Sequence, residues 1–132
     1  MSESAEFFPD PQFLWTKRED LNRRWLIAWS EKDVDGVAAF YHPECTYIDA
    51  QNPLGLRGRE ALRAYLAELF RRTPPMTYRP EALWLIEGGF CGRWRCEIRL
   101  PTGTRYLRGF DLVLLEDGLI RHNEVYTHEL PA

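Results

Sequence analysis

Asp111 is the only charged residue in the apolar segment Gly109–Leu115, whose composition is typical of a buried strand. Burial disfavours an ionised carboxylate, so such a residue pairs with an arginine, accepts several hydrogen bonds, or keeps its proton at a raised pKa. A protonated carboxyl group can donate a hydrogen bond to a ligand oxygen, which a carboxylate cannot do. The residues alone leave open whether Asp111 is a structural or a functional acid.

Asp49 is the second carboxyl group that could act as an acid or a base. It ends the predicted strand Cys45–Asp49 and precedes an irregular loop, where an aspartate often serves only as a turn or cap residue. Tyr47 lies two residues earlier and therefore on the same face of the strand. Trp25 belongs to an apolar helical stripe, in which a tryptophan is usually an ordinary core residue.

The last predicted strand, Leu119–Glu129, carries more polar residues than a central strand usually does. Side-chain alternation gives it two faces: Asn123, Val125 and Thr127 on one, His122, Glu124 and Tyr126 on the other. Either face could point inward, so Asn123, His122 and Glu124 are all candidate ligand contacts. A strand end that runs out into solvent would also explain the polar residues.

Several chemistries are excluded by what the sequence lacks. It contains no G-x-S-x-G, no glycine-rich phosphate loop and no H-E-x-x-H. The three histidines are too scattered for a zinc site, and neither Lys17 nor Lys32 lies in an apolar segment that would suit a Schiff base. We therefore expect neither a metal nor a cofactor.

Composition places the chain among single globular domains. Its 132 residues carry a formal net charge of -3 with dispersed arginines, which argues against nucleic-acid binding. No apolar run approaches the roughly 20 residues that cross a bilayer, and the chain does not open with a signal-peptide pattern. The three cysteines lack C-x-x-C spacing, so we expect reduced thiols in a cytoplasmic protein.

The predicted elements give an α+β fold. Residues 1–14 contain too many prolines for a helix and too many apolar residues for a solvated tail, so we expect an N-terminal arm there and a single domain over residues 15–132. Three helices are predicted: one from about Thr16, one over Val34–Tyr41 capped by Asp33, and one over Arg59–Arg72. The short strand Cys45–Asp49 precedes a loop that runs through Gly58. Four antiparallel strands complete the chain: Thr77–Glu87, Phe90–Leu100, Thr104–Glu116 and Leu119–Glu129.

Two of these strands differ in their alternation. Phe90–Leu100 has an apolar face that includes Trp94 and a charged face, whereas Phe110–Leu115 is apolar on both faces apart from Asp111. A strand that is apolar on both sides, in a sheet with helices on one side only, suggests that a second subunit covers the outer face. We therefore expect a homodimer formed through that face.

The order of several short strings resembles the nuclear transport factor 2-like superfamily, in its SnoaL-like branch. The resemblance runs from about Trp25 to Tyr126 and is carried by Ala28–Pro43, Thr46–Asp49 with Leu56–Gly58, and Gly109–Ile120. It implies a curved sheet wrapped around helices like a cone, with a pocket at the open end and a dimeric assembly.

The same branch includes ketosteroid isomerase, which pairs an aspartate base with an oxyanion hole built from a tyrosine and a protonated aspartate. By this resemblance, Asp49 falls at the position of the base and Asp111 at that of the protonated donor. Trp25 occupies the position of the tyrosine, and its weaker N–H donor argues against efficient steroid enolisation. Related polyketide cyclases and epoxide hydrolases place a carboxylate or histidine on late strands, where His122 and Glu124 lie here.

These observations predict a cofactor-free enzyme, isomerase-like or cyclase-like, acting by general acid–base catalysis on a small apolar molecule with a carbonyl group. Asp49 and Asp111 are the predicted catalytic residues. The predicted substrate contacts are Trp25, Tyr47, Trp94, Asn123, His122 and Glu124. A non-catalytic domain that binds a hydrophobic ligand or a polypeptide stays open as the alternative.

Overall fold

The computed structural model describes residues 10–131 and begins with helix α2, Pro11–Ser30. The Asp10 side chain caps this helix by accepting a hydrogen bond from the Gln12 N–H, and Pro11 suits the first helical turn because its missing N–H has no partner there. The expectation that the prolines keep residues 11–14 out of a helix was therefore wrong. Residues 1–9 of the predicted arm lie outside the described residues.

The two shorter helices lie close to where the sequence places them. Helix α3, Val34–Ala38, is capped by the Asp33 side chain, which accepts from the Gly36 N–H at 2.9 Å. Helix α4, Arg59–Arg72, has the predicted bounds, and Leu62 and Leu66 of its apolar stripe are fully buried.

Six strands form one sheet in the order β2-β1-β6-β5-β4-β3. The strands are β1 Tyr41–Asp49, β2 Asn52–Arg57, β3 Met76–Ile86, β4 Gly89–Leu100, β5 Gly103–Glu116 and β6 Leu119–Leu130. The four antiparallel strands β3 to β6 confirm the predicted meander, and β1 joins it by running parallel to β6. The segment predicted to be a loop after β1 contains the strand β2. Its Pro53 is tolerated because β2 is an edge strand that pairs with β1 alone.

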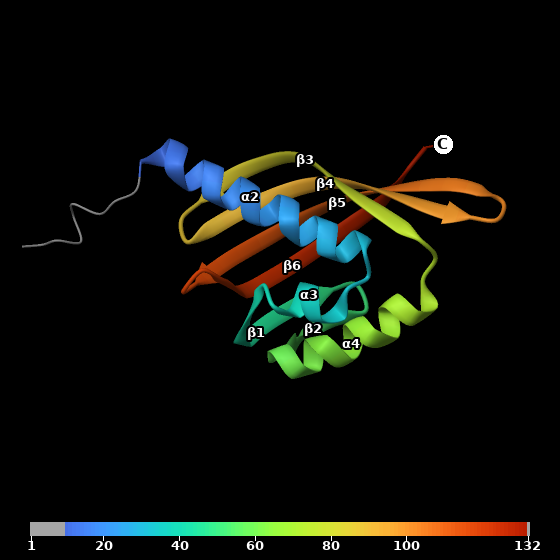
Figure 1. The fold of residues 1–132 in the computed structure, drawn as a ribbon, viewed down its shortest axis with the longest axis horizontal. Coiled ribbons are helices and arrows are strands. Elements are labelled where there is room, and N and C mark those ends of the chain that lie inside the picture. Colours follow the sequence, from blue (N-terminus) through green and yellow to red (C-terminus); the bar gives the residue numbers. More distant parts are fainter. Residues whose placement is uncertain (1–9, 132) are drawn as a thin grey trace, which may run out of the picture.

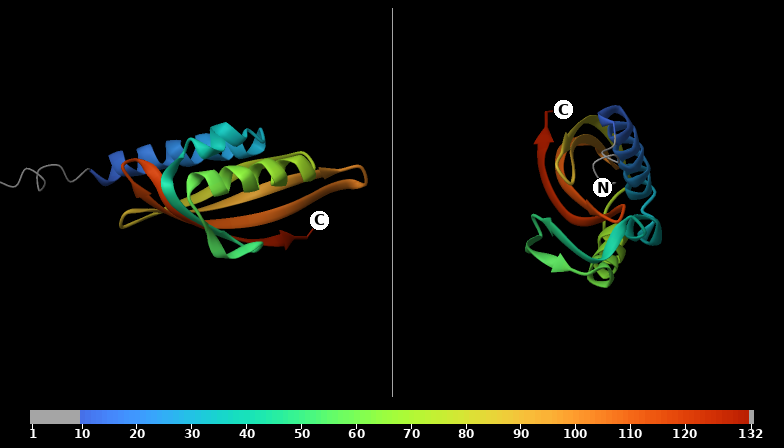
Figure 2. Two further views of the ribbon diagram at one scale, coloured as in Figure 1. Left: turned by 90° about the horizontal axis from the view of Figure 1, so that it is seen from below. Right: turned by 90° about the vertical axis from the view of Figure 1, so that its left-hand side faces the viewer.

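The sheet curves around the helices without closing (Figure 2), which confirms the predicted α+β cone. Helix α2 crosses the concave side over β3 and β4, while α4 packs against β1 and β2 (Figure 1). The core between these layers includes Trp25, Trp29, Tyr41 and Phe90. None of the helices in residues 10–131 is long and apolar enough to span a membrane.

The two faces of the sheet differ as the alternation predicts. On the concave face, Phe90, Trp94 and Cys96 of β4 are buried. On the convex face, Phe110 of β5 and Tyr126 of β6 are paired neighbours and are 40% and 59% exposed. The concave face therefore builds the core, and the convex face presents apolar side chains at the surface.

Candidate functional site

A cavity of about 240 Å³ lies between α2, α4 and the concave face of the sheet. Six aromatic side chains line it: Trp25, Trp29, Tyr47, Tyr65, Tyr78 and Trp94. Asp49 and Asp111 also line it, and no lysine, arginine or histidine among the described residues does. An apolar cavity of about 150 Å³ can hold benzene, so this one suits a molecule of one or two rings.

Asp111 projects from the middle of β5 into the cavity and is only 3% exposed. Trp94 Nε1 donates a hydrogen bond to its Oδ2 at 3.2 Å, while Oδ1 has no partner within residues 10–131. Burial raises the pKa of Asp111 to about 8, and the Trp94 hydrogen bond opposes that shift. The carboxyl group therefore carries a proton at neutral pH, which is one of the three outcomes that the apolar segment allows.

The alternative role for Asp111, a buried ion pair with an arginine, does not occur in the part of the chain that the structure describes. Its cross-strand neighbour on β4 is Gly92, which has no side chain to offer. Gly109 lies two residues earlier and directly opposite Trp94, and a Cβ atom there would be 2.1 Å from the indole ring. Glycine at this position therefore lets the Trp94 indole lie over β5, within reach of Asp111.

Trp25 supplies a second hydrogen-bond donor to the cavity. It lies on α2 and is 1% exposed, and its Nε1 makes no well-aligned hydrogen bond among the described residues, although it lies near enough to the Tyr41 hydroxyl to oppose the rise that burial causes in the pKa of that group. An unpartnered buried N–H is costly and calls for an explanation. Trp25 and Asp111 line the same cavity, so the cavity presents two hydrogen-bonding groups without partners among the described residues.

Asp49 ends β1 and is held by five donors. Its Oδ1 accepts from the Gln51 N–H at 3.0 Å and from the backbone and side-chain nitrogens of Asn52, both at 2.9 Å. Its Oδ2 accepts from the hydroxyl groups of Tyr47 at 3.0 Å and Tyr65 at 2.6 Å. Asp49 is therefore both a turn residue and a residue of the cavity wall, and its carboxylate is held in one orientation.

Tyr47 is a donor that keeps its proton. Burial, followed by the neighbouring Tyr41 and Asp49, holds the pKa of Tyr47 well above its usual range.

The three candidates on β6 lie outside the cavity lining. Asn123 shares the inward face with the lining residues Val125 and Thr127, but its Oδ1 accepts from the Tyr41 hydroxyl at 2.7 Å in the core. His122 and Glu124 lie on the convex face, where His122 Nε2 is 2.7 Å from Glu124 Oε2. Alternation along β6 therefore turns His122 and Glu124 away from the site, and Asn123 contacts the core.

Sequence reasoning missed Tyr65 and Gln51 as site residues. Tyr65 lies on the partly buried face of α4, and its ring centre is 5.8 Å from that of Tyr47. Its hydroxyl group was the available signal, since a polar atom on a buried stripe needs a partner. The position of that partner, Asp49, depends on how α4 packs against β1.

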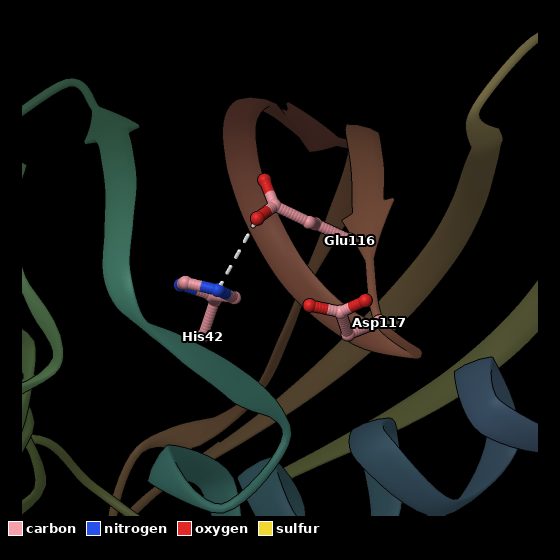
Figure 3. A group of neighbouring side chains, drawn as sticks. All are labelled: His42, Glu116 and Asp117. Atoms are coloured by element: carbon pink, nitrogen blue, oxygen red, sulfur yellow. Dashed lines mark ion pairs between the residues drawn. The ribbon is translucent and has the colours of Figure 1, made fainter.

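His42, Glu116 and Asp117 form a separate group that could offer three ligands to a metal ion (Figure 3). His42 Nε2 lies 3.5 Å from Glu116 Oε2, while His42 Nδ1 accepts a hydrogen bond from the Glu44 N–H. A metal-bound histidine usually donates through its second nitrogen, whereas here that nitrogen accepts. The ring proton of a neutral His42 therefore sits on Nε2, so the group ties β1 to the β5–β6 hairpin and is a poor metal site.

A comparison with protein families finds a match to the SnoaL-like domain over residues 22–123. The chain belongs to this family. No curated protein matches it. The SnoaL-like fold recurs in a protein of ketosteroid isomerase-like fold from Catenulispora acidiphila, crystallised with trimethylamine, with 12% identity and a TM-score of 0.71. That match covers 80% of this chain and 83% of the other.

Two further solved structures share the SnoaL-like fold. A Mycobacterium tuberculosis protein in complex with estradiol-17beta-hemisuccinate has 15% identity and a TM-score of 0.68, covering 83% of this chain and 92% of the other. SalBIII, an epoxide hydrolase/cyclase-like enzyme of pyran ring formation in salinomycin, has 19% identity and a TM-score of 0.70, covering 86% and 92%. Identities this low support the shared fold alone.

Proposed function

We propose that this SnoaL-like domain is a cofactor-free enzyme that moves a proton next to a carbonyl group of a small, largely apolar molecule. The observation that carries the proposal is the pair of unpartnered groups in one cavity, the Asp111 carboxyl and the Trp25 N–H. Asp49 lines the same cavity and supplies a carboxylate as base.

In the proposed reaction, Asp49 takes a proton from the carbon atom beside the carbonyl group. The electron pair of that C–H bond forms a C=C bond, and the carbonyl π electrons move to the oxygen as an enolate. Asp111 O–H and Trp25 N–H donate to this oxygen, and each such donor is worth about 3–4 kcal/mol in a site that excludes water. Where the substrate has a C=C bond one carbon removed from the acidic position, the enolate is a dienolate, and return of the proton to its far carbon gives the conjugated isomer. Attack by the enolate carbon on a second carbonyl group gives a ring, and the proton held by Asp49 passes to the oxygen of that group.

The cavity limits the size of the substrate. A volume of about 240 Å³ favours a molecule of one or two rings, smaller than typical drug-sized ligands, whose pockets measure about 300–1,000 Å³. The aromatic walls favour a flat, apolar body. We therefore propose small cyclic or aryl ketones as the substrate class.

The second candidate function is a non-catalytic domain that binds a hydrophobic ligand. Two features favour it. The oxygens of Asp49 already accept five hydrogen bonds, and Trp25 offers a weaker donor than the tyrosine of ketosteroid isomerase.

A panel of one- and two-ring ketones separates the two functions. Binding is followed by tryptophan fluorescence, and exchange of the hydrogens beside the carbonyl is followed by proton NMR in D2O. An enzyme accelerates exchange for at least one bound ketone, and Asp49→Asn abolishes that acceleration. Binding without exchange for every ketone in the panel would assign the domain to ligand binding.

We also propose a cytoplasmic homodimer whose subunits meet through the convex face of the sheet. Trp84 and Phe110 pack together on this face, with ring centres 5.9 Å apart, and both are more than one-third exposed. The free thiols of Cys45, Cys91 and Cys96 fit a reducing compartment. Sedimentation at micromolar concentration tests the assembly, and a species of 15.6 kDa alone would overturn it.

A further inference from the structure

The hydrogen bonds around Asp49 occupy its carboxylate completely. Two carboxylate oxygens offer about four lone-pair sites in all. Three donors from the turn residues Gln51 and Asn52 reach Oδ1, and the hydroxyl groups of Tyr47 and Tyr65 reach Oδ2. A base needs a free lone pair, so one donor must leave before Asp49 can accept a substrate proton.

Tyr65 is the donor with a second acceptor in reach. Its hydroxyl group lies 2.6 Å from Asp49 Oδ2 and 3.0 Å from Gln51 Oε1, and one O–H donates fully to one acceptor at a time. Arg72 Nη2 donates to the same Gln51 oxygen at 3.0 Å and holds it in place. Tyr47 is 2% exposed, and the one hydrogen bond of its hydroxyl group within residues 10–131 goes to Asp49.

The Tyr65 hydroxyl keeps its proton in either position. Burial, followed by the hydrogen bond to Asp49, holds the pKa of Tyr65 well above its usual range. The hydroxyl can therefore redirect its hydrogen bond without ionising.

We propose that Tyr65 is a positioning residue that gates Asp49: its hydroxyl switches between Asp49 Oδ2 and Gln51 Oε1, and Asp49 is open to a substrate proton only in the second state. This inference rests on the proposed role of Asp49 as the base. The gate lies at the wall of the cavity, because Asp49, Gln51 and Tyr65 all line it. Deprotonation of the substrate is thereby tied to a rearrangement of one hydrogen bond.

Carbon-13 NMR of the Asp49 side-chain carboxyl in the free, full-length protein, recorded at one fixed pH, tests the switch without a substrate. Tyr65→Phe removes the hydroxyl and keeps the ring, so the Asp49 resonance should move away from its position in the unmodified protein because one donor is lost. Gln51→Met removes the competing acceptor and leaves Tyr65 on Asp49, so the resonance should move in the opposite direction.

The double variant separates a switch from two independent effects. Tyr65→Phe combined with Gln51→Met should give the same Asp49 resonance position as Tyr65→Phe alone, because Gln51 acts on Asp49 through Tyr65. Tyr47→Phe is the matched control: it also removes a donor to Oδ2, but the effect of Gln51→Met should persist in its background. A Gln51→Met effect that persists in Tyr65→Phe, or is absent altogether, would overturn the gate.

Ketone exchange in D2O then separates the gate from the reaction. Tyr65→Phe should exchange about two- to tenfold faster than the unmodified protein and Gln51→Met correspondingly slower, as expected for the gain or loss of one hydrogen bond. Slower exchange in Tyr65→Phe would overturn the gate. If the Asp49 resonances follow the expected pattern but the unmodified protein exchanges no ketone, the proposed reaction fails and the hydrogen-bond switch stands.

Discussion

Two carboxyl groups line one cavity in this protein, and their surroundings are opposite. Asp49 accepts five hydrogen bonds, whereas Asp111 accepts one, from Trp94, and leaves its Oδ1 without a partner in the described chain. Burial raises the pKa of Asp111 to about 8, so the two residues suit different roles, one as an acceptor and the other as a donor.

The difference follows from their positions along their strands. Asp49 stands at the end of β1, where the N–H groups of Gln51 and Asn52 are free to bond its side chain. Asp111 lies in the middle of β5, between β4 and β6, where the backbone N–H groups serve the strand ladders. A carboxylate at a strand end is therefore stabilised by the backbone, and one at a strand centre is driven to keep its proton.

The largest expected effect is a loss of stability on substitution in α4, the helix that places Tyr65 next to Asp49. Leu66 of α4 is fully buried, so Leu66→Ala should reduce the free energy of unfolding by about 2–5 kcal/mol through the cavity that it leaves. Arg63 faces solvent and pairs with Asp35, so Arg63→Ala should change stability by no more than about 0.5 kcal/mol. Urea melts measure both, and equal shifts would contradict this orientation of α4.

The donor role of Asp111 is tested by two substitutions of different chemistry. Asp111→Leu should slow ketone exchange by roughly 10²–10³-fold, because it removes the O–H that stabilises the enolate, whereas Asp111→Asn keeps a donor and should lose less. Exchange by the unmodified protein should itself fall as pH rises through about 8, because the ionised Asp111 cannot donate. Equal rates for the two variants would contradict the donor role.

The same leucine substitution should affect stability differently at the two positions. Asp49→Leu strands the Tyr47 hydroxyl and takes their acceptor from the N–H groups of Gln51 and Asn52, so it should cost at least about 2 kcal/mol in thermal or urea melts. Asp111→Leu strands only the Trp94 N–H and removes a buried polar group, so it should cost less. A loss of about 3–5 kcal/mol for Asp111→Leu would instead indicate a broken buried ion pair.

Trp94→Phe should produce the smallest effect. It removes the one hydrogen bond to Asp111 and keeps an aromatic ring in the cavity wall, so the pKa of Asp111 should rise further, because that bond favours the ionised form. Carbon-13 titration of the Asp111 carboxyl measures the shift. A pKa that falls would show that Trp94 stabilises the protonated form.

The sequence predicts one of these two environments much better than the other. Asp111 is recognisable as a buried acid because it is the only charge in Gly109–Leu115, and burial of a strand depends on local composition. The partners of Asp49 come partly from α4, whose packing on β1 joins residues 16 positions apart and leaves no local pattern.

The elements of the fold that follow from local sequence patterns were also predicted better than the others. Helix α4 and the meander β3 to β6 follow from periodicity and turn residues and were predicted closely. The start of α2 and strand β2 were not predicted, because proline was taken to interrupt helices and strands. Its effect depends on its position: Pro11 begins a helix and Pro53 lies on an edge strand, and both positions tolerate proline. The orientation of β6 could not be predicted, since both of its faces carry polar residues.

The proposed stabilisation of an enolate requires that Asp111 is protonated at neutral pH. Carbon-13 NMR of the Asp111 side-chain carboxyl, recorded in the unmodified, ligand-free protein as pH is raised, measures this without any knowledge of the substrate. We predict that the resonance stays at the position of the neutral acid through pH 6 to 7 and moves with a midpoint near 8. A midpoint near the ordinary aspartate value of about 3.9 would mean that Asp111 is ionised in the folded protein, and would contradict its role as a hydrogen-bond donor.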